Sequence, residues 1–160
     1  MGIFIRTYNV YIKTNRSVSN IYSVVIFNRQ DCCSERLNPF NIHIGDSDQV
    51  STNPQCGGDL QIDVSHPSIS VSCPGMRGRY VGVRLPGSSR ILALCEVQVF
   101  PGVNVALGKP TFQTSTAVLG EASRAIDTLA DSCSHTNVHG EANPAWWVDL
   151  GQSYVIDRTS

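Results

Sequence analysis

The sequence predicts an all-β fold, an antiparallel sandwich, from three observations. β-branched and aromatic residues gather in short runs that mostly alternate between apolar and polar side chains, which is the period of a half-buried strand. Glycine and proline clusters separate these runs as turns. Helical character is limited to residues 121–128, a segment too short to organise a fold. Short strands joined by such turns are typical of an antiparallel β-sandwich.

The strands are expected, in chain order, at residues 21–27, 41–44, 69–72, 79–85 and 94–100. A later apolar stretch runs from Trp146 to Ile156 and also alternates as a strand. Because neighbouring strand residues point to opposite faces, we expect one ring of Trp146-Trp147 in the core and the other over its edge. The pair is therefore not interpreted as a sugar-binding platform.

Composition limits the possible functions. A chain of 160 residues can bury one good core, so a single domain is expected. Twelve basic and thirteen acidic residues give a net charge of −1, which argues against general nucleic-acid binding and against a polybasic membrane surface. No apolar run is long enough to span a bilayer. Six cysteines favour an oxidising compartment and a disulfide framework whose pairing the spacing leaves open.

The beginning of the chain does not fit this extracellular picture. Residues Met1 to Ser17 have no continuous apolar core and no small-residue cleavage site, so they are not interpreted as a signal peptide. The sequon Asn15-Arg16-Ser17 is compatible with secretion. We expect a secreted protein whose recorded start is a fragment or a mispredicted exon.

The strongest functional signal is the segment Asn28 to Arg36, which places Arg29, Asp31 and Arg36 around the adjacent cysteines Cys32-Cys33. Two arginines can reach one polar ligand if the chain doubles back between them, and a carboxylate can hold one guanidinium in place. Such a cluster suits neutral polyols or anions, although Arg-x-Asp pairs are more often solvated surface ion pairs. Neighbouring Cα atoms lie about 3.8 Å apart, so a bond between the two cysteines would be strained and would need a local reason.

These residues resemble the F-type lectins, the fucose-binding fucolectins of fish. Residues Arg29 to Arg36 fit the family's Arg-x-Asp-x4-Arg element, and Cys32-Cys33 fits its vicinal disulfide. The closing strands of the family domain match at 78–81 and 94–97, and its opening half matches at 104–107, 125–127, 133–135 and 143–150. The resemblance covers nearly all of residues 20–158 and implies a discoidin-like β-jelly roll, but the closing half comes first.

Two arrangements account for this order. The chain is either the end of one tandem repeat followed by the start of the next, or a single circularly permuted domain. Together the two halves supply each expected part once, and sandwich termini commonly lie close together, so we favour the permuted domain. The expected parts are a divergent segment at 1–19, the closing half at 20–100, a linker at 101–103 and the opening half at 104–160, docked on the closing half.

The resemblance implies three disulfides, Cys32 with Cys33, Cys56 with Cys73, and Cys95 with Cys133, the last of which joins the halves. It also implies an α-L-fucose site made of His135, Arg29 and Arg36, with Asp31 behind an arginine. Guanidiniums would donate to sugar oxygens, a neutral imidazole would accept from a hydroxyl, and the Cys32-Cys33 ring would offer a flat apolar surface. His139 is a rival of His135, whereas His43 and His66 are interpreted as structural.

The resemblance further implies a structural Ca²⁺, an ion that prefers oxygen ligands. The ligands would be the carbonyls of Arg124 and Leu129, the carboxylates of Asp127 and Glu96, and the oxygens of Ser132. The chain has Thr128-Leu129 where the family usually has Gly-Asn, so a turn that needs positive φ is expected to be strained. The alternative is a helix end with capping carboxylates.

The predicted function is a secreted, non-enzymatic lectin domain that binds terminal fucose on glycans, in innate defence, agglutination or gamete recognition. Neither nucleic-acid binding nor membrane insertion is expected. Avidity would come from homo-oligomers or tandem repeats, because single sites bind weakly. The rival functions are a discoidin-type adhesion module for protein or phospholipid, which would need exposed apolar spikes, a thiol redox enzyme using Cys32-Cys33, and an inactive tandem-repeat fragment.

Overall fold

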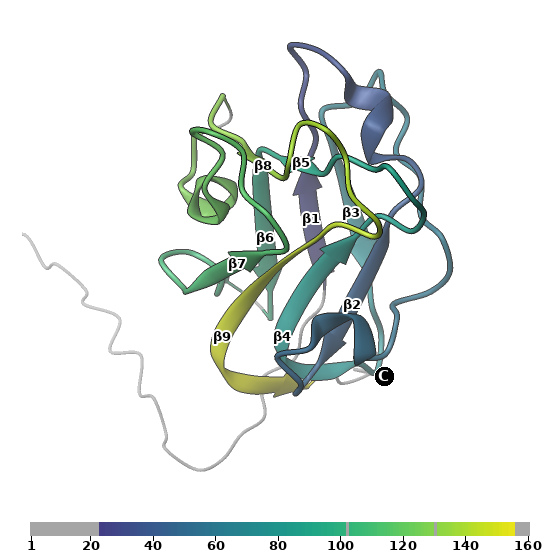
Figure 1. Ribbon diagram of the computed structural model, residues 1–160. Coiled ribbons are helices and arrows are strands. Elements are labelled where there is room, and N and C mark those ends of the chain that lie inside the picture. Colours follow the sequence, from purple (N-terminus) through teal and green to yellow (C-terminus); the bar gives the residue numbers. More distant parts are fainter. Residues whose placement is uncertain (1–22, 102, 130, 156–160) are drawn as a thin grey trace, which may run out of the picture.

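The computed structural model describes residues 23–101, 103–129 and 131–155. Its strands are β1 (Ser23–Phe27), β2 (Asn41–Gly45), β3 (Ser68–Ser72), β4 (Arg77–Arg84), β5 (Ala93–Leu94), β6 (Glu96–Phe100), β7 (Thr111–Gln113), β8 (Ser134–His135) and β9 (Ala145–Val155). Three short 3-10 turns are η1 (Ser34–Leu37), η2 (Val50–Thr52) and η3 (Ala122–Ile126). The strands form antiparallel sheets of order β3-β1-β6, β2-β4-β9-β7 and β5-β8 (Figure 1). The predicted all-β class is therefore confirmed.

The predicted strands are present with shifted ends. β4 begins two positions before the predicted segment 79–85, and the predicted strand at 94–100 is divided at Cys95 into β5 and β6. The segment 121–128 contains η3, and the described residues include no α-helix. β7 and β8 lie outside the predicted strands, because each is too short to show an alternating pattern.

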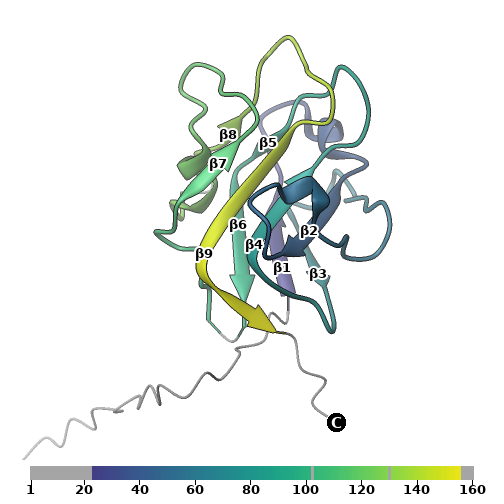
Figure 2. The ribbon, with the colours of Figure 1, turned by 60° about the horizontal axis from the view of Figure 1, so that its bottom comes forward.

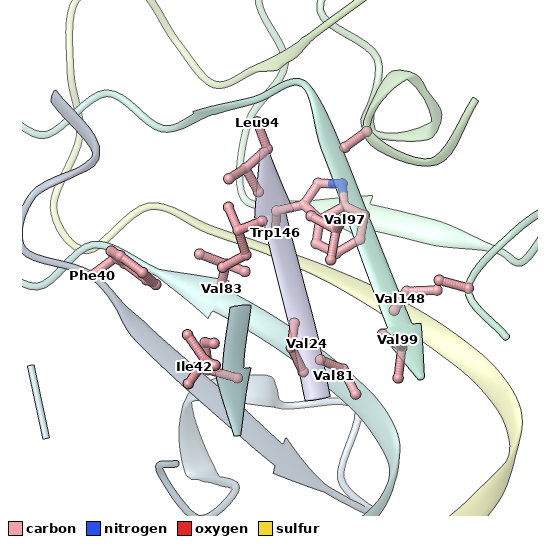
Figure 3. Close-up of a cluster of buried hydrophobic side chains, with 14 of the residues drawn as sticks. Val24, Phe40, Ile42, Val81, Val83, Leu94, Val97, Val99, Trp146 and Val148 are labelled. Carbon is pink, nitrogen blue, oxygen red and sulfur yellow. The ribbon is translucent and has the colours of Figure 1, made fainter. Parts of the chain in front are cut away.

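The core lies between the three-stranded and the four-stranded sheet (Figure 3). β1 and β6 supply Val24, Val97 and Val99 from one side, and β4 and β9 supply Val81, Val83, Trp146 and Val148 from the other; all are fully buried. Burying one such side chain contributes about 1.5–3 kcal/mol. Alternation along the strands is therefore what fixes which face of each sheet points inward.

As predicted, one of the two adjacent tryptophan rings is in the core and the other is not. Trp146 is fully buried, and its Nε1 donates to the carbonyl oxygen of Ala122 at 2.9 Å. Trp147 is half-buried, and its ring stacks on Phe112 of β7 with 5.8 Å between ring centroids. One ring fills the core, and the other covers the outer face of the sheet.

The two parts of the chain on either side of the linker share one sheet. β9 runs antiparallel to β4, from Ala145 opposite Arg84 to Val155 opposite Arg77 (Figure 2). β8 pairs with β5, and the disulfide Cys95–Cys133 bonds the two parts beside this pairing. Main-chain hydrogen bonds, buried side chains and a covalent bond therefore connect residues far apart in the sequence.

The chain turns sharply where the two parts meet. The Oδ1 of Asn104 accepts hydrogen bonds from the amides of Val99 at 3.0 Å and Ala106 at 3.1 Å. The amide of Val105 donates to the carbonyl oxygen of Val99 at 2.9 Å. Asn104 thus works as a local turn residue, in the way that asparagine side chains commonly bond nearby main chain.

Some sequence-based expectations fall outside the described residues. The divergent segment at 1–19 and the sequon Asn15-Arg16-Ser17 belong to this group. Within residues 23–155, apart from positions 102 and 130, no helix is long and apolar enough to cross a membrane.

Replacing both Cys95 and Cys133 by serine is expected to lower the free energy of unfolding by about 4 kcal/mol, because the disulfide closes a loop with a sequence separation of 38. The matched control replaces Cys56 and Cys73, whose separation of 17 gives about 3 kcal/mol by the same relation. Urea unfolding of the three proteins measures both losses. A negligible loss at Cys95–Cys133, with the expected loss at Cys56–Cys73, would contradict the account of how the two parts are held.

Candidate functional site

Three of the predicted sugar ligands line the same hollow. The segment between β1 and β2 and the strand β8, which carry them, lie at one end of the sandwich (Figure 1). Arg29 and Arg36 come from the segment between β1 and β2, and His135 is the last residue of β8. They line one small hollow of about 10 Å³, which Asn28, Cys33, Leu37 and Ala93 complete. A space of this size holds about one water molecule, so a larger ligand would rest over its mouth. The β5-β8 register places His135 opposite Ala93, so the β-pairing between the two parts of the chain brings the histidine to the arginines.

Arg29 is held by Asp31 as the sequence predicts. Its Nε and Nη2 donate to the two carboxylate oxygens at 2.5 and 2.7 Å, a bidentate pair. The hydrogen bonds and the charge of Arg29 lower the pKa of Asp31 to about 2, and the carboxylate raises the pKa of the guanidinium. A guanidinium carries five N–H donors, so Arg29 keeps donors for a ligand after binding Asp31.

The main chain that carries Arg36 is fixed by Arg90, a residue that the sequence analysis does not single out. The Nη2 of Arg90 donates to the carbonyl oxygens of Arg36 at 3.1 Å and Asn38 at 2.9 Å, and its Nη1 donates to that of Pro86 at 2.8 Å. On the other side of η1, the Nδ2 of Asn28 donates to the carbonyl oxygen of Ser34 at 2.9 Å. Arg90 is 54 positions from Arg36 and belongs to no local motif, so no sequence signal identifies it.

All three disulfides that the resemblance implies are present, Cys32–Cys33, Cys56–Cys73 and Cys95–Cys133. The vicinal pair lies between Arg29 and Arg36, where Cys32 is exposed and Cys33 borders the hollow. Cys33 has a φ of 61°, the left-handed conformation that turns the chain back before η1. This reversal is the doubling back that lets both arginines line one hollow.

One ring nitrogen of His135 makes a hydrogen bond within the protein. Its Nδ1 lies 2.6 Å from the carbonyl oxygen of Thr136, and because a carbonyl only accepts, Nδ1 must carry the proton. In the neutral form of the ring, Nε2 is then the acceptor. Gly120 packs against this histidine so closely that an added Cβ would lie 2.8 Å from the His135 Cβ, which excludes larger side chains.

The other histidines are placed elsewhere. His139 is exposed and is not among the residues that line the hollow. His43 is buried in β2, with Nδ1 at 2.8 Å from the carbonyl oxygen of Asn53. His66 is exposed beside Asp63. The geometry thus favours His135 over its rival His139 as a ligand.

A larger cavity of about 490 Å³ adjoins the hollow and shares Arg29 and His135 with it. Its other lining residues include Val118, Leu119 and Val138, with Arg124 and Asp131 at its polar side. Val118 is 94% exposed and Leu119 is 74% exposed. The sequence analysis misses this apolar rim, because its loop has no strand or helix periodicity.

The predicted calcium ligands gather between β6 and the loop after η3. Glu96 is 4% exposed, its Oε2 accepts from the amide of Thr128 at 3.1 Å, and its Oε1 is buried without a hydrogen-bond partner in the part of the chain that is described. Burial raises the pKa of Glu96, and the charge of Asp127 adds to this effect, whereas hydrogen bonds from the Thr128 amide and the Gln98 side chain oppose it. Two neighbouring carboxylates, one with an unsatisfied buried oxygen, suit a bound cation.

The remaining ligands would be main-chain and hydroxyl oxygens. Ser132 is buried, and its amide donates to the carbonyl oxygen of Leu129 at 2.9 Å. The Nε of Arg124 donates to the carbonyl oxygen of Cys133 at 3.2 Å. Because a guanidinium has only donors, Arg124 could offer a metal nothing but its main-chain carbonyl. The described residues contain no group of three or more histidine, cysteine, aspartate or glutamate side chains that could hold a metal. Thr128 has the expected positive φ, 67°, which is strained for a β-branched residue.

The Asp31 carboxyl is expected to titrate with a pKa of about 2. Its pKa is lower in the folded than in the unfolded chain, so the Arg29–Asp31 pair stabilises the fold above the ordinary aspartate value of about 3.9, and this contribution is lost as the pH falls toward 2. Carbon-detected NMR measures the carboxyl titration. In Arg29→Gln the pKa should return toward the ordinary value; equal values in both proteins would exclude the bidentate pair.

Comparison with known proteins supports the relationship. The NedA-like, galactose-binding domain family matches residues 16–83. The chain is 39% identical over 87 residues to a pentraxin fusion protein of Xenopus laevis, covering 53% of this chain and 21% of the relative. It is 44% identical over 87 residues to fucolectin-4 of Anguilla japonica, covering 51% of this chain and 46% of the relative.

A fucolectin of Anguilla anguilla is 40% identical over 87 residues, which are 51% of this chain and 52% of the relative. The chain thus spans about half or less of the length of these relatives. No solved structure is significantly similar to it. Most of the relatives are fucolectins by name. Over the half of its length that these relatives cover, the chain is similar to the F-type lectins, or fucolectins.

Proposed function

We propose that this chain is a non-enzymatic lectin domain that binds terminal α-L-fucose on extracellular glycans. The observation that carries the proposal is that His135, Arg29 and Arg36 border one small hollow beside the Cys32–Cys33 disulfide. A sugar ring would lie over the mouth of this hollow and extend into the adjoining cavity of about 490 Å³, which shares Arg29 and His135. Two guanidiniums supply only donors, and the neutral imidazole supplies an acceptor. A sugar hydroxyl can both donate and accept, so a polyol satisfies this set better than a simple anion does.

The roles of the groups follow from their geometry. Arg29, held by Asp31, and Arg36, on main chain held by Arg90, would donate to the ring oxygen and to neighbouring hydroxyls. The Nε2 of His135 would accept from one hydroxyl. The exposed Cys32 and the half-buried Cys33 would pack against the apolar carbon edge of the sugar. Because these supports exist without ligand, little ordering is needed on binding.

We also propose that the two parts of the chain form one circularly permuted jelly-roll domain, with residues 20–100 as the closing half and 104–160 as the opening half. The pairing of β4 with β9 and the bond between Cys95 and Cys133 support this. A complete sugar site depends on it, because His135 lies in one half and both arginines lie in the other.

A structural Ca²⁺ held by Glu96, Asp127, Ser132 and the carbonyls of Arg124 and Leu129 completes the proposal. The unsatisfied Oε1 of Glu96 supports it. The ion would offset the two carboxylate charges and fix the loop between η3 and β8, which leads to His135. We expect an extracellular protein, to which the disulfide framework is suited, with homo-oligomers or tandem repeats supplying avidity in innate defence or agglutination.

One observation favours a second function, an adhesion module for phospholipid or protein. Val118 and Leu119 form an exposed apolar loop tip, the kind of feature that an interfacial membrane reader requires. Their position beside Arg29 and His135 also suits contact with the glycan beyond the fucose. The two functions separate in one experiment, because vesicle binding through Val118 would survive the loss of Arg29 and Arg36.

Arg29→Ala and Arg36→Ala are each expected to weaken binding of methyl α-L-fucoside by at least about tenfold, because a hydrogen bond from a charged group contributes about 1.5–3 kcal/mol. Isothermal titration calorimetry measures the affinity, and near-UV circular dichroism reports whether the fold is kept. Arg77→Ala is the matched control, since Arg77 is an exposed arginine of β4 that does not line the hollow. Unchanged affinity in both site variants would refute the proposed fucose site.

Calcium binding is expected to raise the melting temperature, and EDTA to lower it. Because burial raises the pKa of Glu96 and a metal ligand must be deprotonated, Ca²⁺ affinity should increase with pH. Glu96→Gln should remove the EDTA effect, whereas Asp63→Asn, which changes an exposed carboxylate outside this loop, should keep it. Scanning calorimetry at two pH values measures these effects. Identical melting temperatures in Ca²⁺ and in EDTA would rule out the structural ion.

A further inference from the structure

A second hollow lies on the outer face of the four-stranded sheet. It has a volume of about 220 Å³ and is lined by Asp48, Gln49, Tyr80, Phe112, Trp147 and Asp149. None of these residues lines the fucose hollow or the cavity that adjoins it. We propose that this hollow is a second carbohydrate site, which takes one neutral pyranose ring. Trp147 would then have the sugar contact that the sequence analysis does not assign to it.

The aromatic floor of the hollow is fixed by the sheet. The β7-β9 register places Phe112 directly opposite Trp147, and their rings stack at 5.8 Å with 20° between planes. Phe112 remains 45% exposed, so the stacked pair presents apolar surface to solvent. Rings held by paired strands lose little freedom on binding, and apolar ring surface suits the carbon-bound hydrogens of a sugar.

A glycine in β4 allows the polar residues Asp48 and Gln49 to lie beside the aromatic pair. On the other side of Trp147, the β4 residue opposite it is Gly82, where an added Cβ would lie 2.3 Å from a methyl of Val50. The η2 turn lies over β2 and β4 (Figure 2). Because Gly82 has no side chain, this turn can bring Val50 directly onto the sheet. This seating brings the exposed Asp48 and Gln49, just before η2, to the aromatic pair. Their carboxylate and amide can accept from and donate to sugar hydroxyls.

The charges favour a neutral ligand over a cation. Both oxygens of Asp149 accept from Arg79, at 2.7 and 2.8 Å, and Arg79 lowers the pKa of Asp149. The same guanidinium lies 5.4 Å from the centroid of the Tyr80 ring. A ligand cation at the Tyr80 face would meet Arg79, which already lies over that ring and would repel it. The lining of the hollow contains no lysine or arginine beside Asp48. Its carboxylate therefore remains able to accept hydrogen bonds from the hydroxyls of a sugar.

The size of the hollow limits the ligand. A volume of about 220 Å³ lies below the range of about 300–1,000 Å³ that is usual for drug-sized ligands, so the hollow suits one ring and not an oligosaccharide. A chain with one site at the end of the sandwich and another on its sheet face could bridge two glycan branches. Linked sites of this kind gain avidity without any new contact.

The test uses the full-length Arg29→Ala/Arg36→Ala double variant, in which the proposed fucose site is disabled. Methyl β-D-galactopyranoside, methyl β-D-glucopyranoside and methyl α-D-mannopyranoside are titrated while the two indole N–H signals are followed by NMR. Trp147 should shift saturably with at least one of these sugars, with a dissociation constant on the order of millimolar, and the buried Trp146 should not. Because the fucose site is absent from this protein, failure here and failure of the proposed function are distinguishable.

Asp48→Asn, added to that background, is expected to weaken the interaction at least fivefold, and Asp63→Asn is the matched control that should leave it unchanged. Asp48→Asn in the otherwise unaltered chain should not change binding of methyl α-L-fucoside. The proposal is overturned if none of the three sugars shifts Trp147 saturably up to tens of millimolar. It is also overturned if Asp48→Asn leaves the shift intact, or if only tetramethylammonium or protein self-association produces it.

Discussion

The pairing of β4 with β9 is the interaction on which the rest of the structure depends. It joins residues 103–155 to the sheet begun by β2 and β4, and it places Trp146 and Val148 against the side chains of β1 and β6. Without this pairing, both the inward face of β9 and the free edge of β4 would be exposed, an arrangement that favours aggregation. The sugar site inherits the same dependence, because His135 reaches Arg29 and Arg36 only when β8 lies against β5.

Each proposed sugar ligand is oriented by a group that does not itself need to touch the sugar. Asp31 holds the Arg29 guanidinium, Arg90 holds the main chain of Arg36, and the carbonyl of Thr136 fixes the tautomer of His135. Such supports matter because a weak polyol ligand offers little energy with which to order flexible side chains. The left-handed turn at Cys33 adds the change of direction that brings the two arginines to one side of the loop.

Sequence patterns predict those features of the structure that depend on residues close together in the sequence. Alternation finds β1, β2, β3, β4 and β6, and the Arg29-x-Asp31 spacing finds the bidentate pair. The parts that sequence reasoning misses depend on contacts between distant residues. Arg90 donates hydrogen bonds to main-chain carbonyls more than 50 positions away. Gly120 is required because β8 passes beside it, and Gly82 leaves room for Val50 of another loop. The exposure of Val118 and Leu119 is likewise a property of the folded loop.

The region of Glu96 shows why a cation is part of the proposed function. Protonating Glu96 would remove one of two adjacent negative charges, but it would leave a buried oxygen without a partner among the described residues. Calcium would offset both charges and coordinate that oxygen in one step, and it would also give a reason for the strained φ of Thr128, whose amide binds Glu96. Glu96 belongs to one part of the chain and Asp127 to the other. A bound ion would therefore reinforce the junction between β5-β6 and the η3-β8 loop that presents His135, coupling metal binding to the geometry of the sugar site.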